Sequence, residues 1–163
     1  MRIYVFAILA ASAAISQHPV FAAERWQTYV NARFGYSLCY PRPALRAGNE
    51  APNGDGIALD SKSGAQVSVY GSNDVDGDSF EHLVAKQYKE HVARGEQVTY
   101  RRTGENWAVL SGKNAATIFY ERFVVRDDQS ITLKIRYPQR EKAVWNPIVS
   151  RMSRCLSIGT PAF

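Results

Sequence analysis

The chain has 163 residues, of which 45% are hydrophobic and 21% are charged, and its formal net charge is +5. This apolar content supplies a core and excludes an intrinsically disordered chain. Residues 23–163 have the length of one ordinary domain.

The start of the chain has the pattern of a secretory signal peptide over 1–22. A positive beginning is followed by an uncharged apolar run over 3–15 and by the small residue Ala22. We expect cleavage after Ala22, with Ala23 as the alternative, and a single α+β domain over 23–163. The apolar run is shorter than the roughly 20 residues of a membrane span. The sequence therefore predicts an exported protein, periplasmic or secreted, with a retained N-terminal anchor as the alternative.

Two cysteines remain in the predicted mature chain, Cys39 near its start and Cys155 near its end. Exported proteins enter a compartment in which disulfides can form. We expect a bridge between these two residues, and two separately buried thiols are the alternative. The bridge would stabilise the fold by about 4–5 kcal/mol on the chain-entropy model, because it closes a long loop.

The first half of the chain predicts four strands. In the second of them a large apolar residue alternates with a small one, so Cys39 faces away from Leu38. A loop rich in turn residues separates this hairpin from two shorter strands. The predicted strands cover 26–30, 34–41, 57–60 and 66–70, and the loop covers 48–56.

Residues 78–94 form the predicted central helix. Asp78 and Glu81 have the spacing of a capping box, and Gly95 fits a left-handed C-terminal cap. Apolar residues recur at helical spacing and predict one buried face. The residues of that face are Phe80, Leu83, Val84, Tyr88 and Val92.

Four antiparallel strands joined by short turns are predicted next, at 98–102, 107–111, 117–126 and 131–138. The third is apolar on both sides, which is typical of a central strand, and the fourth has one cationic face.

The chain closes with a predicted helical region. Residues 139–145 are amphipathic, and Asn146 and Pro147 have the pattern of an N-cap and a first helical residue. Cys155 lies on the apolar face of this last helix, so packing of that face against the early hairpin would bring the two sulfurs together. The elements together predict an α+β fold, an antiparallel sheet of about six to eight strands with a central helix and a C-terminal helix packed on it.

Motifs for catalysis and metal binding are incomplete in this sequence. Residues 73–78 resemble a calcium loop, but Ser79 stands where a glycine is required and Ala85 where a glutamate is required. His82 and His91 lie nine residues apart on opposite sides of the predicted helix, so they cannot share a metal ion. We interpret His91 as a boundary residue of the buried face rather than a base. No catalytic, metal-binding or cofactor-binding residue is predicted, and no cofactor.

Positive charge is concentrated in the second half of the chain. Residues 23–96 contain eight basic and ten acidic side chains, whereas 97–163 contain eleven basic and five acidic ones. Tyrosines are interleaved with the basic residues, a combination that binds polyanions. The alternatives are a solvated surface and the pairing of Glu121 with Arg136 across the last hairpin. The possible anion-binding residues are Arg101, Arg102, Lys134, Arg136, Arg151 and Arg154.

Several segments carry a resemblance to known proteins. They are the run Asn-Ala-Arg-Phe-Gly-Tyr-Ser-Leu-Cys-Tyr-Pro at 31–41 and the segments 53–56, 69–73, 107–112 and 147–153. Together they resemble an uncharacterised family of secreted and periplasmic proteins from Gram-negative bacteria. The part from Tyr36 to Pro41 also resembles the early strand pair of the Mog1/PsbP fold. That resemblance implies an antiparallel sheet between helices and a non-catalytic binding or assembly role, as in photosystem II and small-GTPase regulation.

The sequence therefore predicts an exported non-enzymatic binding or assembly domain that acts on an envelope or extracellular protein partner. Two alternatives stay open. One is electrostatic binding of an anionic envelope polymer or lipid through the basic second half, and the other is an enzyme whose site the sequence does not reveal. Nucleic acid is not an expected partner, because the protein is exported, and no transmembrane segment is expected in 23–163.

Overall fold

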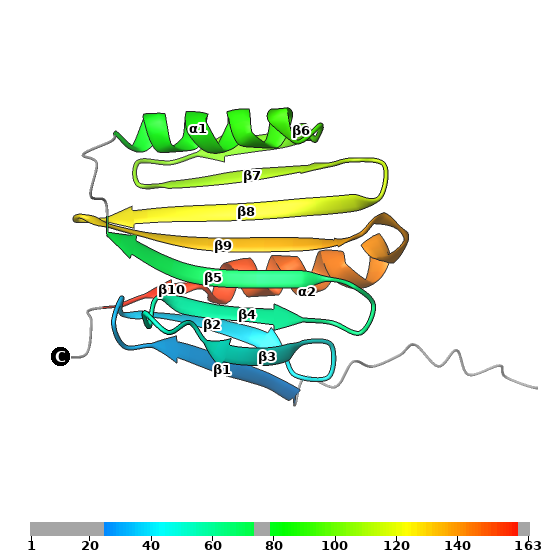
Figure 1. Cartoon of the computed structure of the whole chain (residues 1–163), viewed down its shortest axis with the longest axis horizontal. Helices are drawn as coiled ribbons and strands as arrows, with labels where there is room; N and C mark the ends of the chain where they lie inside the picture. The colour runs from blue at the N-terminus through cyan, green and yellow to red at the C-terminus, as the bar shows by residue number, and fades with distance from the viewer. Residues whose placement is uncertain (1–24, 74–78, 160–163) are drawn as a thin grey trace, which may run out of the picture.

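The computed structural model of the chain describes residues 25–73 and 79–159. The predicted signal peptide, both expected cleavage sites and the Asp78 cap lie outside the described residues. Within the described residues, ten strands form two antiparallel sheets, and two α-helices pack against them (Figure 1). The predicted α+β fold with an antiparallel sheet is confirmed.

The bounds of the elements are as follows. The strands are β1 (Trp26–Asn31), β2 (Tyr36–Pro41), β3 (Arg46–Glu50), β4 (Gly56–Asp60), β5 (Gln66–Asn73), β6 (Gln97–Thr103), β7 (Trp107–Lys113), β8 (Thr117–Arg126), β9 (Gln129–Pro138) and β10 (Ser157–Ile158). The helices are α1 (Phe80–Ala93), the short 3-10 helix η2 (Gln139–Glu141) and α2 (Lys142–Cys155).

The two sheets and the two helices form layers. The large sheet has the strand order β3-β4-β5-β9-β8-β7-β6, and the small sheet has the order β1-β2-β10. In Figure 1, α1 lies along the β6 edge in front of the large sheet, and α2 passes behind β5 and β9. Side chains alternate on β9, so Leu133 and Ile135 face the α2 side while Lys134 and Arg136 face the α1 side.

Two apolar cores lie on opposite faces of the large sheet. The main core fills the space between the large sheet, the small sheet and α2, where Leu38, Leu133 and Met152 are fully buried. Burial of such a side chain contributes roughly 1.5–3 kcal/mol. This core contains more buried apolar residues than the other one, so it carries most of the apolar stabilisation. The smaller core lies between α1 and the sheet and contains Val84, Ala108, Leu110, Phe119 and Phe123.

Most of the predicted strands are present, but two observed strands were missed. β3 falls partly in the segment expected to be a loop, and it is an exposed edge strand whose register shifts between Ala47 and Glu50. β10 has only two residues and pairs with β2. Neither has the β-branched composition or the alternation that identifies a strand in a sequence.

The predicted buried face of α1 is partly wrong. Val84 is buried as expected, but Tyr88 and Val92 are 39% and 52% exposed, and the fully buried residue of the last turn is His91. The helix turns the row of positions 80, 84, 87 and 91 toward the sheet, so the imidazole of His91 is buried in the last turn, where the sequence predicted Val92. The helix begins after Ser79, whose hydroxyl accepts a hydrogen bond from the backbone nitrogen of His82 at 3.2 Å. The observed N-cap is Ser79, one residue after the predicted cap Asp78, which lies outside the described residues, and Gly95 has the expected positive φ of 73°.

The predicted start of the last helix is also wrong. α2 runs without interruption from Lys142, and Pro147 lies inside it. Proline removes the backbone donor that would reach the carbonyl of Ala143, but Ala143 is exposed, so water can satisfy that carbonyl. Trp145 is buried in the main core and holds the first turns of the helix against the sheet. Within the described residues, no helix is long and apolar enough to span a membrane.

Candidate functional site

An apolar groove with basic residues at its rim lies between α2 and the start of the described part of the chain. It is a cavity of about 320 Å³, and we call it the α2 groove. Pro41 at the end of β2 and Pro43 in the turn after it contribute one wall, and α2 contributes the other wall. The groove is lined by Arg25, Trp26, Pro41, Pro43, Ala44, Val144, Pro147, Ile148 and Arg151.

Three arginines surround this groove. Arg25 and Arg151 line it, and Arg42 lines an adjoining cavity of about 570 Å³ that shares Arg25, Trp26 and Pro43 with it. The guanidinium of Arg151 lies over the Trp26 ring at 4.2 Å from the ring centroid. Among the described residues that line the two cavities none is acidic, and none of the three arginines forms an ion pair with a described residue. The α2 groove thus combines apolar surface with uncompensated positive charge.

Backbone hydrogen bonds hold one wall of the α2 groove in place. Arg42 donates its backbone N–H to the carbonyl of Arg25 at 3.0 Å, and the N–H of Leu45 bonds the carbonyl of Pro41 at 2.9 Å. These bonds fix the turn that carries Pro43, and the proline rings restrict the backbone further. A surface that is already ordered loses little conformational entropy on binding.

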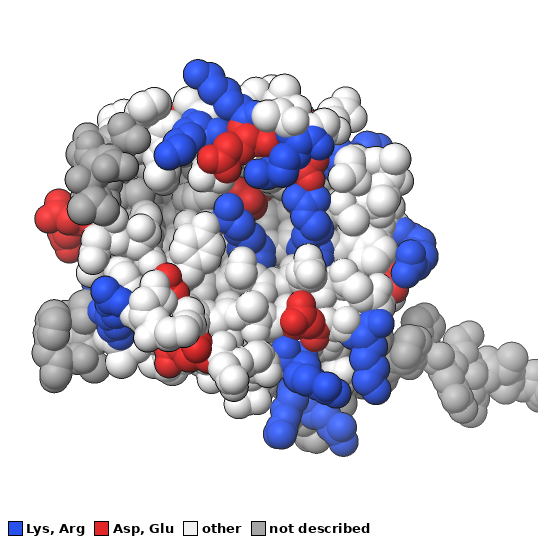
Figure 2. Space-filling model, viewed as in Figure 1, with Lys and Arg blue, Asp and Glu red and all other residues white. Residues whose placement is uncertain are grey.

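A second cavity, also of about 320 Å³, opens on the other face of the large sheet beside α1, and we call it the sheet cleft. Figure 2 looks onto this face and shows basic and acidic side chains gathered over the middle of the sheet below α1. The cleft is lined by Ala58, Asp60, Gln66, Val67, Ser68, Phe119, Glu121, Lys134, Ile135 and Arg136.

A buried ionic network lies beside the sheet cleft. His91 is fully buried between two carboxylates, with Nδ1 2.6 Å from Glu96 Oε2 and Nε2 3.2 Å from Glu121 Oε2. Its ring stacks on Phe119 at a centroid distance of 3.8 Å. Arg136 pairs with Glu96, and Lys134 Nζ lies 3.5 Å from Glu121 Oε1. The network joins α1 and the segment that follows it to β8 and β9.

The ionisation of the carboxylates follows from their partners. Burial by itself would raise the pKa of Glu96, but hydrogen bonds and charge from Arg136 and His91 outweigh it and lower the pKa from 4.5 to about 2. Burial likewise opposes ionisation of Glu121, and His91 and Lys134 nevertheless lower its pKa. Burial also disfavours the charged form of Lys134, but Glu121 raises the pKa of its ammonium group. Both carboxylates and the lysine are therefore charged at neutral pH.

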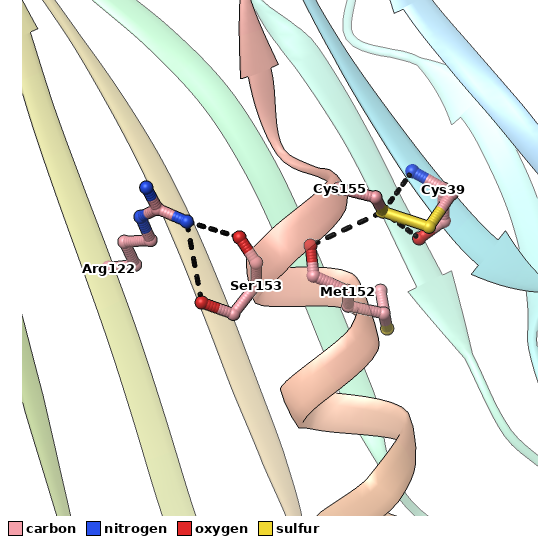
Figure 3. The surroundings of a disulfide bond; sticks show 5 residues. All are labelled: Cys39, Arg122, Met152, Ser153 and Cys155. Atoms are coloured by element: carbon pink, nitrogen blue, oxygen red, sulfur yellow. Dashed lines mark hydrogen bonds between the residues drawn. A yellow bond between two sulfur atoms is a disulfide. The ribbon is translucent and has the colours of Figure 1, made fainter.

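The expected disulfide is present. Cys39 and Cys155 are joined, with their Cα atoms 5.8 Å apart, and the bridge ties the end of α2 to β2 (Figure 3). Arg122 on β8 donates a hydrogen bond to the carbonyl of Ser153, so the same end of α2 is also held by the large sheet. Among the described residues no cysteine is free.

The structure distributes the six basic residues of the predicted anion-binding set over separate surfaces. Arg101 and Arg102 are exposed on the edge strand β6, and Arg102 lies over the Trp107 ring. Lys134 and Arg136 line the sheet cleft. On the opposite face, Arg151 lines the α2 groove, and Arg154 lines a further cavity on α2 and donates to Ser150.

The predicted pairing of Glu121 with Arg136 is wrong. The two-residue turn between β8 and β9 places Glu121 opposite Lys134 and Phe119 opposite Arg136. Arg136 instead reaches Glu96, which follows α1 in the sequence. The prediction was wrong by two positions on β9. Residues on one face of a strand are two positions apart, and the observed register places Lys134 instead of Arg136 opposite Glu121.

Sequence reasoning missed Trp26, His91 and Glu96. Trp26 follows Arg25 at the start of the domain, but the sequence does not show that α2 packs beside it. His91 lies seven residues after Val84, which places it on the same side of the helix, and that spacing was the available signal. Within the described residues there is no group of three histidine, cysteine, aspartate or glutamate residues that could hold a metal ion.

Comparison with solved structures identifies the fold. The structure is similar to cyanobacterial PsbP (CyanoP) from Synechocystis sp. PCC 6803, with a TM-score of 0.63 and 11% identity over 89% of this chain and 99% of that one. It is also similar to the Ran-binding protein Mog1p from Saccharomyces cerevisiae, with a TM-score of 0.60 and 9% identity over 82% and 95% of the two chains. The Mog1/PsbP-like fold expected from the sequence is thereby confirmed, and at this identity the likeness concerns the fold alone. No family model and no curated protein sequence matches the chain.

Proposed function

We propose that this chain is an exported, non-enzymatic binding domain that docks an envelope or extracellular protein through the α2 groove. The observation that carries the proposal is the composition of that groove, an apolar floor surrounded by arginines without acidic neighbours among the described lining residues. Specific interfaces are built in this way, with aromatic and arginine anchors around an apolar centre.

The chemistry of the groove defines what would bind there. Val144 is 47% exposed, and Pro43 and Pro147 are exposed as well, so a partner gains by covering this apolar surface. Arg25, Arg42 and Arg151 would each meet a carboxylate of the partner. The complementary ligand is a peptide segment that carries both apolar and acidic side chains.

Two further observations support this proposal. Mog1p, which has the same fold, is described as a Ran-binding protein, so this architecture is compatible with a role in protein binding. The disulfide between Cys39 and Cys155 fits an oxidising compartment, as does the signal-peptide pattern of the first residues.

Purely electrostatic binding of an anionic polymer or lipid is the competing function. Its support is weaker, because the basic residues of the second half lie on separate surfaces rather than on one face. Binding that depends on charge alone falls steeply with salt, whereas binding that also buries apolar surface persists. Salt dependence therefore separates the two functions.

Site-specific photo-crosslinking tests the proposed function. The full chain is expressed with a photoreactive amino acid at Pro43 or Val144 in the groove, or at the exposed control position Thr99 on β6. Cells are irradiated, and the exported protein is purified under denaturing conditions. We expect the same discrete protein adduct from both groove positions and none from Thr99.

A charge-reversed groove is the second part of this experiment. The double variant Arg25→Glu/Arg151→Glu should reduce the groove adduct by about tenfold or more, which corresponds to 1.4 kcal/mol of binding free energy. Adducts that are absent from both groove positions, or that survive the charge reversal unchanged, would overturn the proposal.

A further inference from the structure

Negative and positive side chains of the ionic network at the sheet cleft differ in burial. Arg94, Lys134 and Arg136 approach two carboxylates, those of Glu96 and Glu121. The carboxylate side chains are only 2% and 5% exposed, whereas the cationic side chains are 31 to 46% exposed. The two carboxylates are therefore enclosed, and the charges of Lys134 and Arg136 face the cleft.

The two cations that line the cleft, Lys134 and Arg136, are held in place by contacts with buried side chains. Arg136 uses one guanidinium nitrogen, Nη1, for both Glu96 and Thr117, which leaves its other nitrogens available to a ligand. Its guanidinium also lies over the Phe119 ring, at 6.0 Å from the centroid. Lys134 lies between Glu121 and the ring of Tyr70. Cations fixed in this way bind an anion with little loss of side-chain entropy.

His91 positions this arrangement and does not contact the cleft. It is fully buried, and its two nitrogens face the two carboxylates that hold Arg136 and Lys134. Buried ionic networks carry a large desolvation cost, and apolar residues of similar volume are often as stabilising. Stability alone therefore does not account for a five-residue network here, whereas the placement of two cations at a cavity does.

The opposite wall of the cleft supplies neutral hydrogen-bonding groups. Ser68 on β5 lies opposite Lys134 in the sheet register, and Gln66 lies opposite Arg136. Neither the hydroxyl of Ser68 nor the amide of Gln66 forms a side-chain hydrogen bond within the described part of the chain. Ala58 on the neighbouring strand β4 is paired with Ser68, and its small side chain leaves the cleft open.

Asp60 limits the kind of ligand that fits. It lines the far side of the cleft beside Gln66, two strands away from Arg136. Its carboxylate disfavours a ligand with negative charge at both ends. A volume of about 320 Å³ is at the lower end for small-molecule sites, which span about 300–1,000 Å³.

We propose that the sheet cleft is a binding site for a small molecule that carries one oxyanion group, a carboxylate or a phosphate, at one end. Lys134 and Arg136 bind the oxyanion, and the hydroxyl of Ser68 donates to it. This site is independent of the α2 groove, because the two lie on opposite faces of the large sheet.

Titration with two simple probes tests this site. The exported protein is labelled with ¹⁵N, and sodium acetate or sodium phosphate replaces sodium chloride at constant ionic strength. We expect saturable shifts of the backbone amides around Ser68 and around Lys134 with at least one probe. Saturation by acetate alone identifies a carboxylate ligand, and saturation by phosphate alone identifies a phosphate ligand. Shifts that are absent or linear in concentration with both probes would overturn the proposal.

Matched variants assign the effect to the cleft. Lys134→Met and, separately, Ser68→Ala should weaken the apparent affinity, the lysine change by about tenfold or more because it removes a charge-assisted bond. Ser68→Ala leaves the buried network intact, so it reports on binding even if Lys134→Met folds poorly. Arg101→Met/Arg102→Met removes the same type of charge from β6 and should have no effect, as should Arg25→Glu/Arg151→Glu in the groove. Equal weakening in the β6 variant would show non-specific attraction and would also overturn the proposal.

Discussion

Arg151 stacks on Trp26, with its guanidinium carbon 4.2 Å from the centroid of the ring. One residue comes from the last helix and the other from the first strand, so the contact joins the two ends of the domain across the α2 groove. A cation over an indole face is stabilised by about 0.5–2 kcal/mol, depending on its exposure. The pair fixes one wall of the groove and presents a guanidinium at its rim.

Replacement of Trp26 tests the structural side of this contact. Trp26→Ala removes a half-buried indole that packs against the main core, so we expect a loss of about 1–2 kcal/mol in the free energy of unfolding. Trp26→Phe keeps an aromatic face under Arg151 and should recover most of that loss. Urea unfolding measures both variants, and an unchanged midpoint for Trp26→Ala would contradict the packing described here.

Removal of the disulfide should strongly destabilise the domain. Cys39 and Cys155 are separated by 116 positions, and a loop of that length corresponds to about 4–5 kcal/mol on the chain-entropy model. The variant Cys39→Ala/Cys155→Ala should lose this amount in urea unfolding. Reductant should lower the wild type toward the same midpoint and leave the variant unchanged. Thiol labelling of the unfolded wild type without reductant would show that the bridge does not form.

The buried histidine should be essential for stability. His91→Ala leaves two buried carboxylates without the group between them and removes a ring from the face of Phe119, so we expect a loss of about 3–5 kcal/mol. Lys86→Ala on the exposed side of the same helix should change the free energy of unfolding by less than about 0.5 kcal/mol.

A double variant separates the charge effect from the packing effect of His91. Glu121→Gln removes one of the two buried charges, so His91→Ala/Glu121→Gln should be more stable than the sum of the single changes predicts. Strict additivity of the two changes would mean that His91 and Glu121 do not interact.

Stability should fall with acid over a defined pH range. The pKa of Glu96 is about 2 in the folded protein and 4.5 without its partners, so the unfolded state binds a proton at a higher pH than the folded state. The stabilisation that the ionised Glu96 contributes to the folded state is complete above pH 4.5 and is lost as the pH falls from 4.5 to about 2. Glu121 acts in the same direction, because its pKa is also lowered.

The variant Glu96→Gln tests this assignment. It should flatten the dependence of the urea midpoint on pH between 4.5 and about 2, although its stability at neutral pH will be lower. Glu105→Gln, which changes an exposed carboxylate in the turn before β7, should keep the wild-type profile. An equally steep profile in Glu96→Gln would place the acid sensitivity elsewhere.

The fold could be predicted from the sequence where side-chain periodicity is strong. β2 alternates between buried aromatic or aliphatic residues and smaller ones, and β8 is apolar on both faces because cores lie on both sides of it. The same alternation placed Cys39 on the face opposite Leu38, and its bond to Cys155 depends on how the end of α2 lies beside β2. β3 could not be predicted, because its pairing depends on its neighbour β4 rather than on its own composition.

The candidate sites could not be predicted because they depend on long-range packing. The α2 groove brings together the start of the domain, the turn after β2 and α2, which no local pattern connects. Side-chain periodicity does not predict that the polar residue His91 is buried. Its burial depends on two carboxylates outside the helix, Glu96 in the segment after α1 and Glu121 on β8. A sequence shows which residues can be charged, but only the register of β8 and β9 shows which of them meet.

Recovery of the partner at two salt concentrations tests the central claim most directly. The crosslinked partner is identified, and its recovery on the tagged full chain is compared among the wild type, Arg25→Glu/Arg151→Glu and Arg101→Glu/Arg102→Glu, at low and then at high salt. We predict that the wild type and the β6 variant retain the partner through the high-salt wash, and that the groove variant loses it at both concentrations. Equal retention by all three proteins, or loss from all three at high salt, would contradict a specific interface at the α2 groove.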